Sequence, residues 1–313
     1  IGGTSTGAII AAALSIGMSV DALRKFYLSS GAEMFDKAGW LRRFNYKYED
    51  ERRAAKLREV YGADTTLGSD RLRTLLLIIL RNATTDSPWP ISNNPAAKYN
   101  DLSRPDSNLR LPLWQVVRAS TAAPVYFPPE VVHVGQQSFV FQDGGITMYN
   151  NPALQLFLMS TLDAYRLNWP SGEDKMLVVS LGTGTSPDAN ANLSPNQMNL
   201  LYNASSIPSA LMLAASVQQD MLCRVLGRCR YGEPLDREIG DLMASAGPVQ
   251  SKHFTYMRYN VELSAASLSA LGLANIKPEH VQCLDSIEYM DELQAVGRAA
   301  AGRIQLAHFD GFV

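Results

Sequence analysis

Continuous apolar runs alternate along this chain with segments of helical periodicity. The runs LRTLLLIIL (residues 72–80) and KMLVVSLGTG (residues 175–184) are typical of strands that are buried on both faces. The segments TGAIIAAALSIG (residues 6–17) and LWQVVRAS (residues 113–120) have helical patterns instead. Strands that alternate with helices predict an α/β layer fold with a largely parallel sheet.

Composition excludes several classes of protein. The 313 residues are 46% hydrophobic and 19% charged with a formal net charge of −2, so no basic field favours nucleic acid. The apolar runs are far shorter than the roughly 20 residues of a membrane-spanning helix. The odd cysteine count, Cys223, Cys229 and Cys283, argues against a disulfide framework and favours reduced thiols. We therefore expect a protein that is cytoplasmic or peripheral to a membrane, although a preceding signal peptide is left open.

The chain begins with the sequence IGGTSTGAII, in which Gly3-Thr4-Ser5-Thr6-Gly7 fits the pattern G-x-S-x-G. In a nucleophile elbow this pattern places serine on a sharp turn between a strand and a helix, where flanking glycines avoid clashes. The backbone N–H groups at the start of the helix can stabilise an oxyanion. A glycine and serine turn without chemistry is the plainer alternative. A phosphate-binding loop is excluded because Ala8 follows the last glycine where lysine is needed.

A serine nucleophile needs a base. The histidines His133, His253, His280 and His308 lie in no glycine-rich or otherwise marked loop. Asp143 is a better candidate, because it ends an apparent strand and precedes Gly144 and Gly145 in FQDGGITMYNNP. An ordinary Asp-Gly turn is the alternative interpretation. We expect Asp143 to face Ser5, since strand ends meet across a sheet.

Three segments, in order, resemble one family. GGTSTGAI resembles the nucleophile elbow of patatin-like phospholipases, ASTAAPVYFPP resembles the segment between their catalytic residues, and DGG resembles their aspartate motif. The resemblance implies a three-layer α/β/α sandwich with a mostly parallel sheet. It also implies a Ser-Asp dyad in which Ser5 is the nucleophile and Asp143 the general base, supported by Gly3, Thr6, Gly7, Gly144 and Gly145. The implied substrate is a phospholipid or another acyl lipid, cleaved without a metal or cofactor.

The sequence departs from the family at its start. The family has a glycine-rich oxyanion loop upstream of the elbow, and no such loop precedes Ser5 here. We therefore expect residues 1–313 to be a single catalytic domain truncated at its N-terminus, lacking this loop and the strand before Ser5. Loss of one oxyanion donor commonly costs about 10²–10³ in rate, so we expect the fragment to be impaired.

Two other functions stay open at this stage. One is a conventional Ser-His-Asp esterase, and the other is a non-catalytic lipid-binding or regulatory module.

Residues 37–58 are a candidate segment for peripheral membrane contact. They carry eight basic and three acidic residues together with Trp40, Phe44, Tyr46 and Tyr48. A solvated helix whose aromatic side chains pack inward is the alternative interpretation of that segment. The sequence does not determine an oligomeric state.

Overall fold

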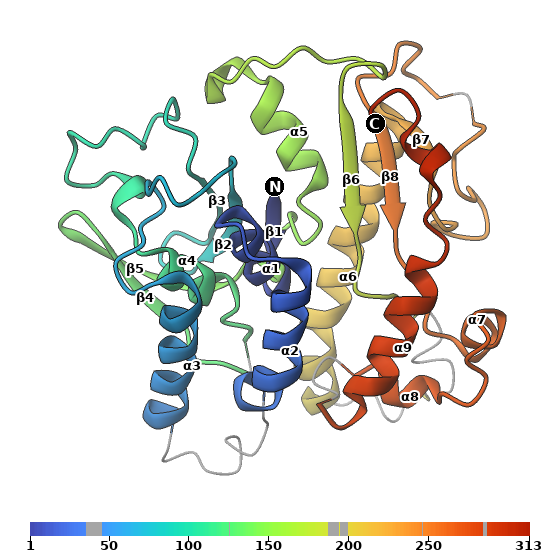
Figure 1. The fold of residues 1–313 in the computed structure, drawn as a ribbon, viewed down its shortest axis with the longest axis horizontal. Helices are drawn as coiled ribbons and strands as arrows, with labels where there is room; N and C mark the ends of the chain where they lie inside the picture. The colour runs from blue at the N-terminus through green and yellow to red at the C-terminus, as the bar shows by residue number, and fades with distance from the viewer. Residues whose placement is uncertain (36–45, 125, 187–193, 195–199, 246, 284–286) are drawn as a thin grey trace. The chain divides into compact units, whose positions relative to one another are not determined.

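The computed structural model describes residues 1–35, 46–124, 126–186, 194, 200–245, 247–283 and 287–313. The chain divides into two compact units: unit 1 is Ile1–Trp169 with Ile207–Ser216, and unit 2 is Pro170–Ser206 with Val217–Val313. Unit 1 contains the elements β1 (Gly2–Thr4), α1 (Thr6–Ser15), α2 (Val20–Phe35), α3 (Tyr46–Tyr61), β2 (Leu77–Asn82), β3 (Ser87–Ser92), α4 (Leu113–Ser120), β4 (Glu130–Val134), β5 (Gln137–Asp143) and α5 (Ala153–Thr161). Figure 1 shows the course of the chain.

Unit 1 is built on a five-stranded sheet with β2 at its centre. β3 pairs with β2 along its whole length, from Leu77 to Asn82, and so occupies one edge of that strand. β1 pairs with Leu77–Ile79 and β5 with Leu80–Asn82, so these two strands lie end to end along the other edge. β4 extends the sheet beyond β5.

The mostly parallel sheet expected from sequence is wrong for unit 1. Three of its four strand pairings are antiparallel, and only β1 and β2 run parallel. Short connections explain two of these pairings, β2 with β3 and β4 with β5, because a tight turn can join only antiparallel strands. A turn between Asn82 and Ser87 joins β2 to β3, and Gly135, with φ 61°, lies in the turn between β4 and β5.

A three-residue strand precedes Ser5, although the sequence analysis expected none. Gly2–Thr4 form β1, which pairs with β2 in parallel. Sequence reasoning also missed β3, whose sequence SPWPIS contains Pro88 and Pro90. Proline cannot donate a ladder hydrogen bond, and it is tolerated here because β3 is an edge strand.

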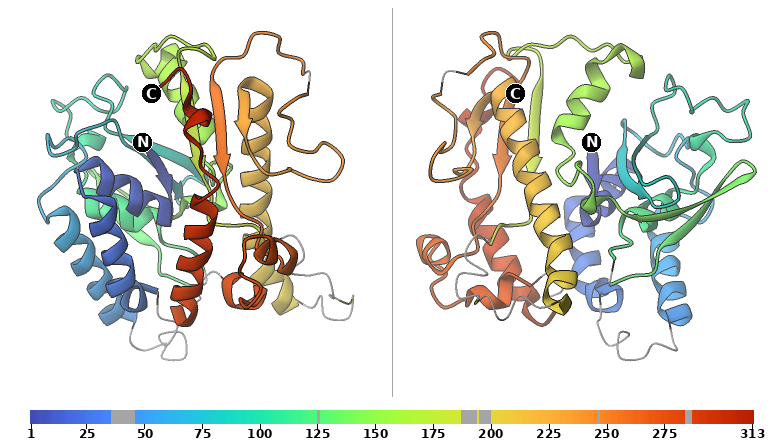
Figure 2. Two further views of the ribbon diagram at one scale, coloured as in Figure 1. Left: turned by 45° about the vertical axis from the view of Figure 1, so that its right-hand side comes forward. Right: turned by 180° about the vertical axis from the view of Figure 1, so that it is seen from behind.

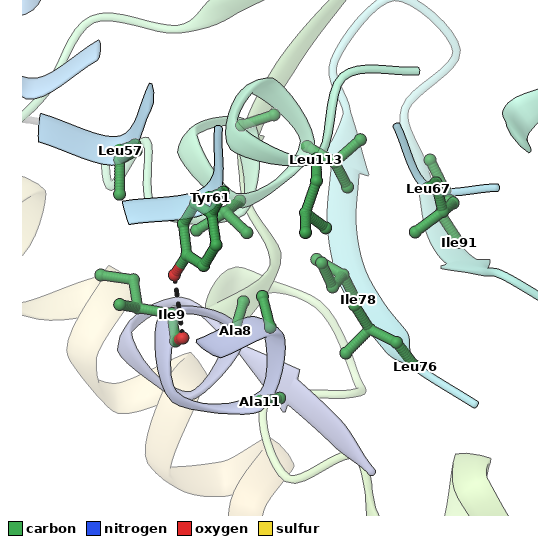
Figure 3. Close-up of a cluster of buried hydrophobic side chains, with 14 of the residues drawn as sticks. Ala8, Ile9, Ala11, Leu57, Tyr61, Leu67, Leu76, Ile78, Ile91 and Leu113 are labelled. Carbon is green, nitrogen blue, oxygen red and sulfur yellow. Dashed lines mark hydrogen bonds between the residues drawn. The ribbon is translucent and has the colours of Figure 1, made fainter. Parts of the chain in front are cut away.

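Alternate residues of β2 face two apolar clusters. Ile78 and Leu80 are buried in a cluster with α1, α3 and α4, part of which Figure 3 shows. Leu77 and Ile79 are buried on the opposite face with Met159 of α5. Helices therefore pack against both faces of the central strand. This double burial explains why Leu77–Leu80 of β2 are apolar without alternation.

Unit 2 has a three-stranded parallel sheet, in the order β6 (Leu177–Leu181), β8 (Thr255–Tyr259) and β7 (Arg228–Tyr231). The strand predicted within residues 175–184 is confirmed as β6, but its expected burial on both faces is wrong, because Val179 and Leu181 are exposed. The other elements of this part of the chain are α7 (Ala265–Ala270), α8 (Pro278–Val281), α9 (Met290–Ala301) and α6 (Leu200–Leu226), of which residues Ile207–Ser216 belong to unit 1. α6 is a single continuous helix of 27 residues (Figure 2). None of the described helices is long and apolar enough to cross a bilayer.

Candidate active site

Ser5 lies on a strained turn between β1 and α1. Its backbone has φ 55° and ψ −125°, and a positive φ is uncommon for residues other than glycine. The turn brings the chain back on itself so tightly that a Cβ atom on Gly3 would lie 2.0 Å from the carbonyl oxygen of Gly7. Only glycine fits at position 3, and this close approach forms the expected elbow.

Gly7 is not required by sterics, which corrects the expectation that both flanking glycines avoid a clash. A Cβ atom on Gly7 would meet no heavy atom within 4 Å, because the residue lies in the first turn of α1 and faces open space. The two glycines of the motif therefore have different roles.

Asp143 lies beside Ser5 because of the register of the sheet. Thr4 is opposite Ile79, and Asp143 is opposite Leu80, the next residue of β2. The C-terminal ends of β1 and β5 meet at this point. The Ser5 hydroxyl donates a hydrogen bond to Asp143 Oδ2 over 2.5 Å, although the two residues are 138 positions apart.

The Asp143 carboxyl is almost wholly buried, with a relative exposure of 2%. Burial disfavours the charged form and raises the pKa of Asp143 from 3.8 to about 6, while the hydrogen bonds from Ser5 and from the Gly145 N–H oppose this rise. A carboxyl group with such a pKa is ionised at neutral pH and is a stronger base than an exposed aspartate. It can accept the proton of the hydroxyl that it contacts.

Gly144 and Gly145 form the turn that holds the carboxylate. The Gly145 N–H donates to Asp143 Oδ1 over 2.7 Å, which fixes the oxygen that does not contact Ser5. A Cβ atom on Gly144 would lie 2.2 Å from the carbonyl oxygen of Ile79. The glycine at position 144 therefore lets the turn lie directly against β2.

Ser120, at the end of α4, is a site residue that sequence reasoning missed. Its hydroxyl is fully buried, accepts a hydrogen bond from the Ser5 N–H over 3.0 Å and donates one to the Ile79 carbonyl over 2.6 Å. Ser120 thereby ties the strained elbow to the central strand. The only sequence signal was its position in ASTAAPVYFPP, the segment singled out for its resemblance.

Thr6 begins α1, and its carbonyl accepts a hydrogen bond from the Tyr27 hydroxyl over 3.0 Å. The N–H groups of Thr6 and Gly7 belong to the first turn of the helix, where no intrahelical acceptor exists. Together with the helix dipole, these N–H groups can bind an anion beside the Ser5 hydroxyl.

The four histidines make contacts of their own. His133 Nδ1 lies 2.9 Å from Ser138 Oγ within the β4–β5 hairpin, and the side chain of His253 is exposed. His280 Nδ1 lies 3.0 Å from Glu292 Oε2, and His308 Nδ1 lies 2.8 Å from the Tyr259 hydroxyl. The direct contact between Ser5 and Asp143 leaves no space for an imidazole between them in this conformation.

Within the described residues, no group of three or more His, Cys, Asp or Glu side chains is arranged to hold a metal ion. Cys223, Cys229 and Cys283 are free thiols, as predicted. Residues 37–45 of the basic and aromatic segment, including Trp40 and Phe44, lie outside the described residues, and residues 46–58 belong to α3.

The chain matches a known protein family over half its length. Residues 1–157, which include Ser5, Ser120 and Asp143, match the family described as patatin-like phospholipase.

Individual proteins also match. The chain is 29% identical over 193 residues to the intracellular phospholipase A2 of Caenorhabditis elegans, covering 59% of this chain and 16% of that protein. It is 25% identical over 208 residues to patatin-15 of Solanum tuberosum, covering 60% of this chain and 50% of the patatin. The 85/88 kDa calcium-independent phospholipase A2 of Rattus norvegicus is 29% identical over 203 residues, which cover 60% of this chain and 23% of the rat protein. The aligned part of the chain thus spans half or less of the length of each of these relatives.

Proposed function

Because the chain belongs to the patatin-like phospholipase family, we propose that it is a lipid acyl hydrolase that cleaves acyl esters through Ser5 and Asp143. The observation that carries this proposal is the 2.5 Å hydrogen bond from the Ser5 hydroxyl to a buried carboxylate. The substrate class is phospholipid or another acyl lipid. Residues 1–313 are proposed to act as one catalytic domain of the three-layer α/β/α type.

In the proposed reaction, Asp143 accepts the Ser5 proton as Oγ attacks the ester carbonyl. The oxyanion that forms is stabilised by N–H groups at the start of α1. Collapse of the tetrahedral intermediate transfers the proton from Asp143 to the departing alcohol and leaves an acyl group on Ser5. Asp143 then takes a proton from a water molecule as the water attacks the acyl carbon, the bond to Ser5 Oγ breaks, the proton returns from Asp143 to Oγ, and the fatty acid is released.

A fluorophosphonate probe tests the nucleophile directly. We expect the probe to form one covalent bond to Ser5 Oγ with loss of fluoride, and intact-protein mass spectrometry to show one adduct that is absent in Ser5→Ala. Fatty acid release from phosphatidylcholine should also require Ser5. An adduct of equal yield in the Ser5→Ala protein would place the nucleophile elsewhere.

The labelling rate should fall as pH falls through about 6, because the Asp143 carboxyl has a pKa near this value and only its ionised form accepts the proton. Below the midpoint the rate should drop by about tenfold per pH unit.

Two other results would favour the alternative functions. A midpoint near 7 that is lost on replacing His133, His253, His280 or His308 by Ala would instead favour a Ser-His-Asp esterase. Vesicle binding without any labelling would favour a non-catalytic lipid-binding module.

Ser120 is expected to act as a positioning residue. In Ser120→Ala the Ser5 N–H loses its acceptor, and the elbow can relax from its strained conformation. We expect kcat on a soluble short-chain ester to fall by about tenfold or more, since small misplacements of a nucleophile are costly. KM and the pH midpoint should stay unchanged, because the Ser120 hydroxyl bonds to the Ser5 N–H and the Ile79 carbonyl and not to the Asp143 carboxylate.

The neighbouring Thr121→Ala variant is the matched control for Ser120. The Thr121 hydroxyl donates to the Arg118 carbonyl, within the last turn of α4. The Thr121→Ala variant should therefore show the effect of a change at the end of α4 that leaves the hydrogen bond between Ser120 and Ser5 in place. Equal kcat in wild type and in Ser120→Ala would show that the hydrogen bond to Ser5 has no positioning role.

A further inference from the structure

One face of α6 is apolar and exposed. The exposed fractions are 52% for Ile207, 56% for Leu211 and 43% for Leu213. Ala210 and Ala214 are exposed as well, and their three- and four-residue spacing from the larger side chains places all five on one side of the helix. We call these five residues the α6 apolar face. A helix that faces water normally carries polar side chains there.

The sequence around this face lacks charge. Between Asp188 and Asp220 there is no Asp, Glu, Lys, Arg or His residue. Singly exposed apolar residues are common, but a contiguous exposed apolar surface marks a site of interaction with a partner or a membrane. The absence of charge indicates that this surface binds through apolar contact and not through ion pairing.

The same part of α6 packs against the turn that carries Asp143. Asn150 Nδ2 donates to the Met212 carbonyl over 2.8 Å and lies 3.1 Å from the Ser216 hydroxyl. The Met212 Cε atom lies 3.0 Å from the Cβ position of Gly145, whose N–H binds Asp143. The helix thus turns one side towards the candidate catalytic turn and the apolar face away from it.

We propose that the α6 apolar face docks on the surface of a lipid bilayer and so brings the dyad to its substrate. The inference rests on the proposed function, because a lipid acyl hydrolase must reach substrate molecules that are held in a bilayer. An uncharged face suits the acyl region of a zwitterionic membrane. A second copy of the chain or a protein partner could also cover an apolar face, but neither would require the helix that bears this face to pack against the turn of Asp143.

Vesicle binding by the Ser5→Ala protein tests the surface independently of catalysis. We expect Ile207→Gln, Leu211→Gln and Leu213→Gln together to reduce binding to phosphatidylcholine vesicles by at least about tenfold. Glutamine is chosen because its helix propensity is close to that of leucine. The matched control replaces three exposed apolar residues elsewhere in unit 1 by Gln, namely Val20, Leu28 and Leu162, which are 69%, 42% and 46% exposed. This control should bind as the parent does.

The salt concentration and the physical form of the substrate distinguish docking by the α6 apolar face from the alternatives. Binding should change little between about 0.1 M and about 1 M NaCl, whereas docking by the basic residues 37–58 would weaken steeply and need anionic lipid. With Ser5 restored, the triple α6 variant should lose hydrolysis of vesicle phospholipid but keep hydrolysis of a soluble short-chain ester. If the parent protein hydrolyses neither substrate, the proposed function fails, and the vesicle-binding result still decides the docking surface.

Two results would overturn the proposal. One is unchanged vesicle binding by the triple α6 variant. The other is a wild-type dimer in light scattering that the same three substitutions convert to a monomer, because the face would then be covered by a second copy.

Discussion

Replacing Asp143 by Asn is expected to abolish hydrolysis and, at neutral pH, to make the folded protein more stable. The substitution is nearly isosteric. The amide oxygen can still accept the Gly145 N–H, and the amide nitrogen can donate to Ser5 Oγ in place of the present hydrogen bond. The change therefore removes a charge and a base while it keeps the shape of the site.

The loss of activity follows from the loss of the proton acceptor. An uncharged amide cannot take the hydroxyl proton, and a positioned general base typically contributes about 10²–10⁴ in rate. We expect kcat/KM on a short-chain ester to fall by about 10³ or more. Residual activity above about a tenth of the wild type would show that Asp143 is not the base.

The gain in stability follows from the direction of the pKa shift. The pKa of Asp143 is raised by burial from 3.8 to about 6, so the folded state binds the proton more tightly than the unfolded chain. Wild-type stability should therefore fall as pH rises from about 4 to about 6, by about 3 kcal/mol in total. Asp143→Asn lacks this titration, so its advantage should grow over that window and stay constant above it.

Urea unfolding at several pH values measures this difference. The control is Asp163→Asn, an exposed carboxylate in unit 1, which should change the free energy of unfolding by less than about 0.5 kcal/mol at every pH. If Asp143→Asn is less stable than wild type at pH about 8, the buried carboxylate stabilises the fold and the assignment of its raised pKa is wrong.

Gly3→Ala and Gly7→Ala should have opposite effects on stability. The new methyl group at position 3 would lie 2.0 Å from the Gly7 carbonyl oxygen and 2.6 Å from the Ala8 nitrogen, which are backbone atoms of the elbow. We expect a loss of about 3 kcal/mol or more, or failure to fold. At position 7 the methyl group meets nothing within 4 Å. Because alanine favours a helix over glycine, a gain of up to about 1 kcal/mol is expected there.

Urea unfolding of the two variants, with soluble yield as a second readout, tests this contrast. Each variant is the control for the other, since both add one methyl group to the same five-residue motif. Similar stabilities for the two proteins would contradict the elbow geometry. Gly7→Ala should stay folded whatever its effect on substrate binding, because it alters only an open position.

Local features of this protein were predictable from the sequence. The helix at Leu113–Ser120 was predicted at its observed bounds, and the predicted helix after Ser5 is α1. The motif around Ser5 and the turn at Asp143 were also identified, because turn residues and apolar periodicity act over a few neighbouring positions. The sequence therefore determined which short segments form and which side chains could take part in chemistry.

Only the tertiary structure decided how these segments meet. The register of β1 and β5 on β2 brings Ser5 and Asp143 into contact, and it depends on pairings between residues far apart in sequence. The hydrogen bond of Ser120 to the elbow and the raised pKa of Asp143 depend on the same packing. A hydroxyl and a carboxyl group gain this reactivity only when many distant side chains exclude water around them. No short stretch of sequence encodes that exclusion.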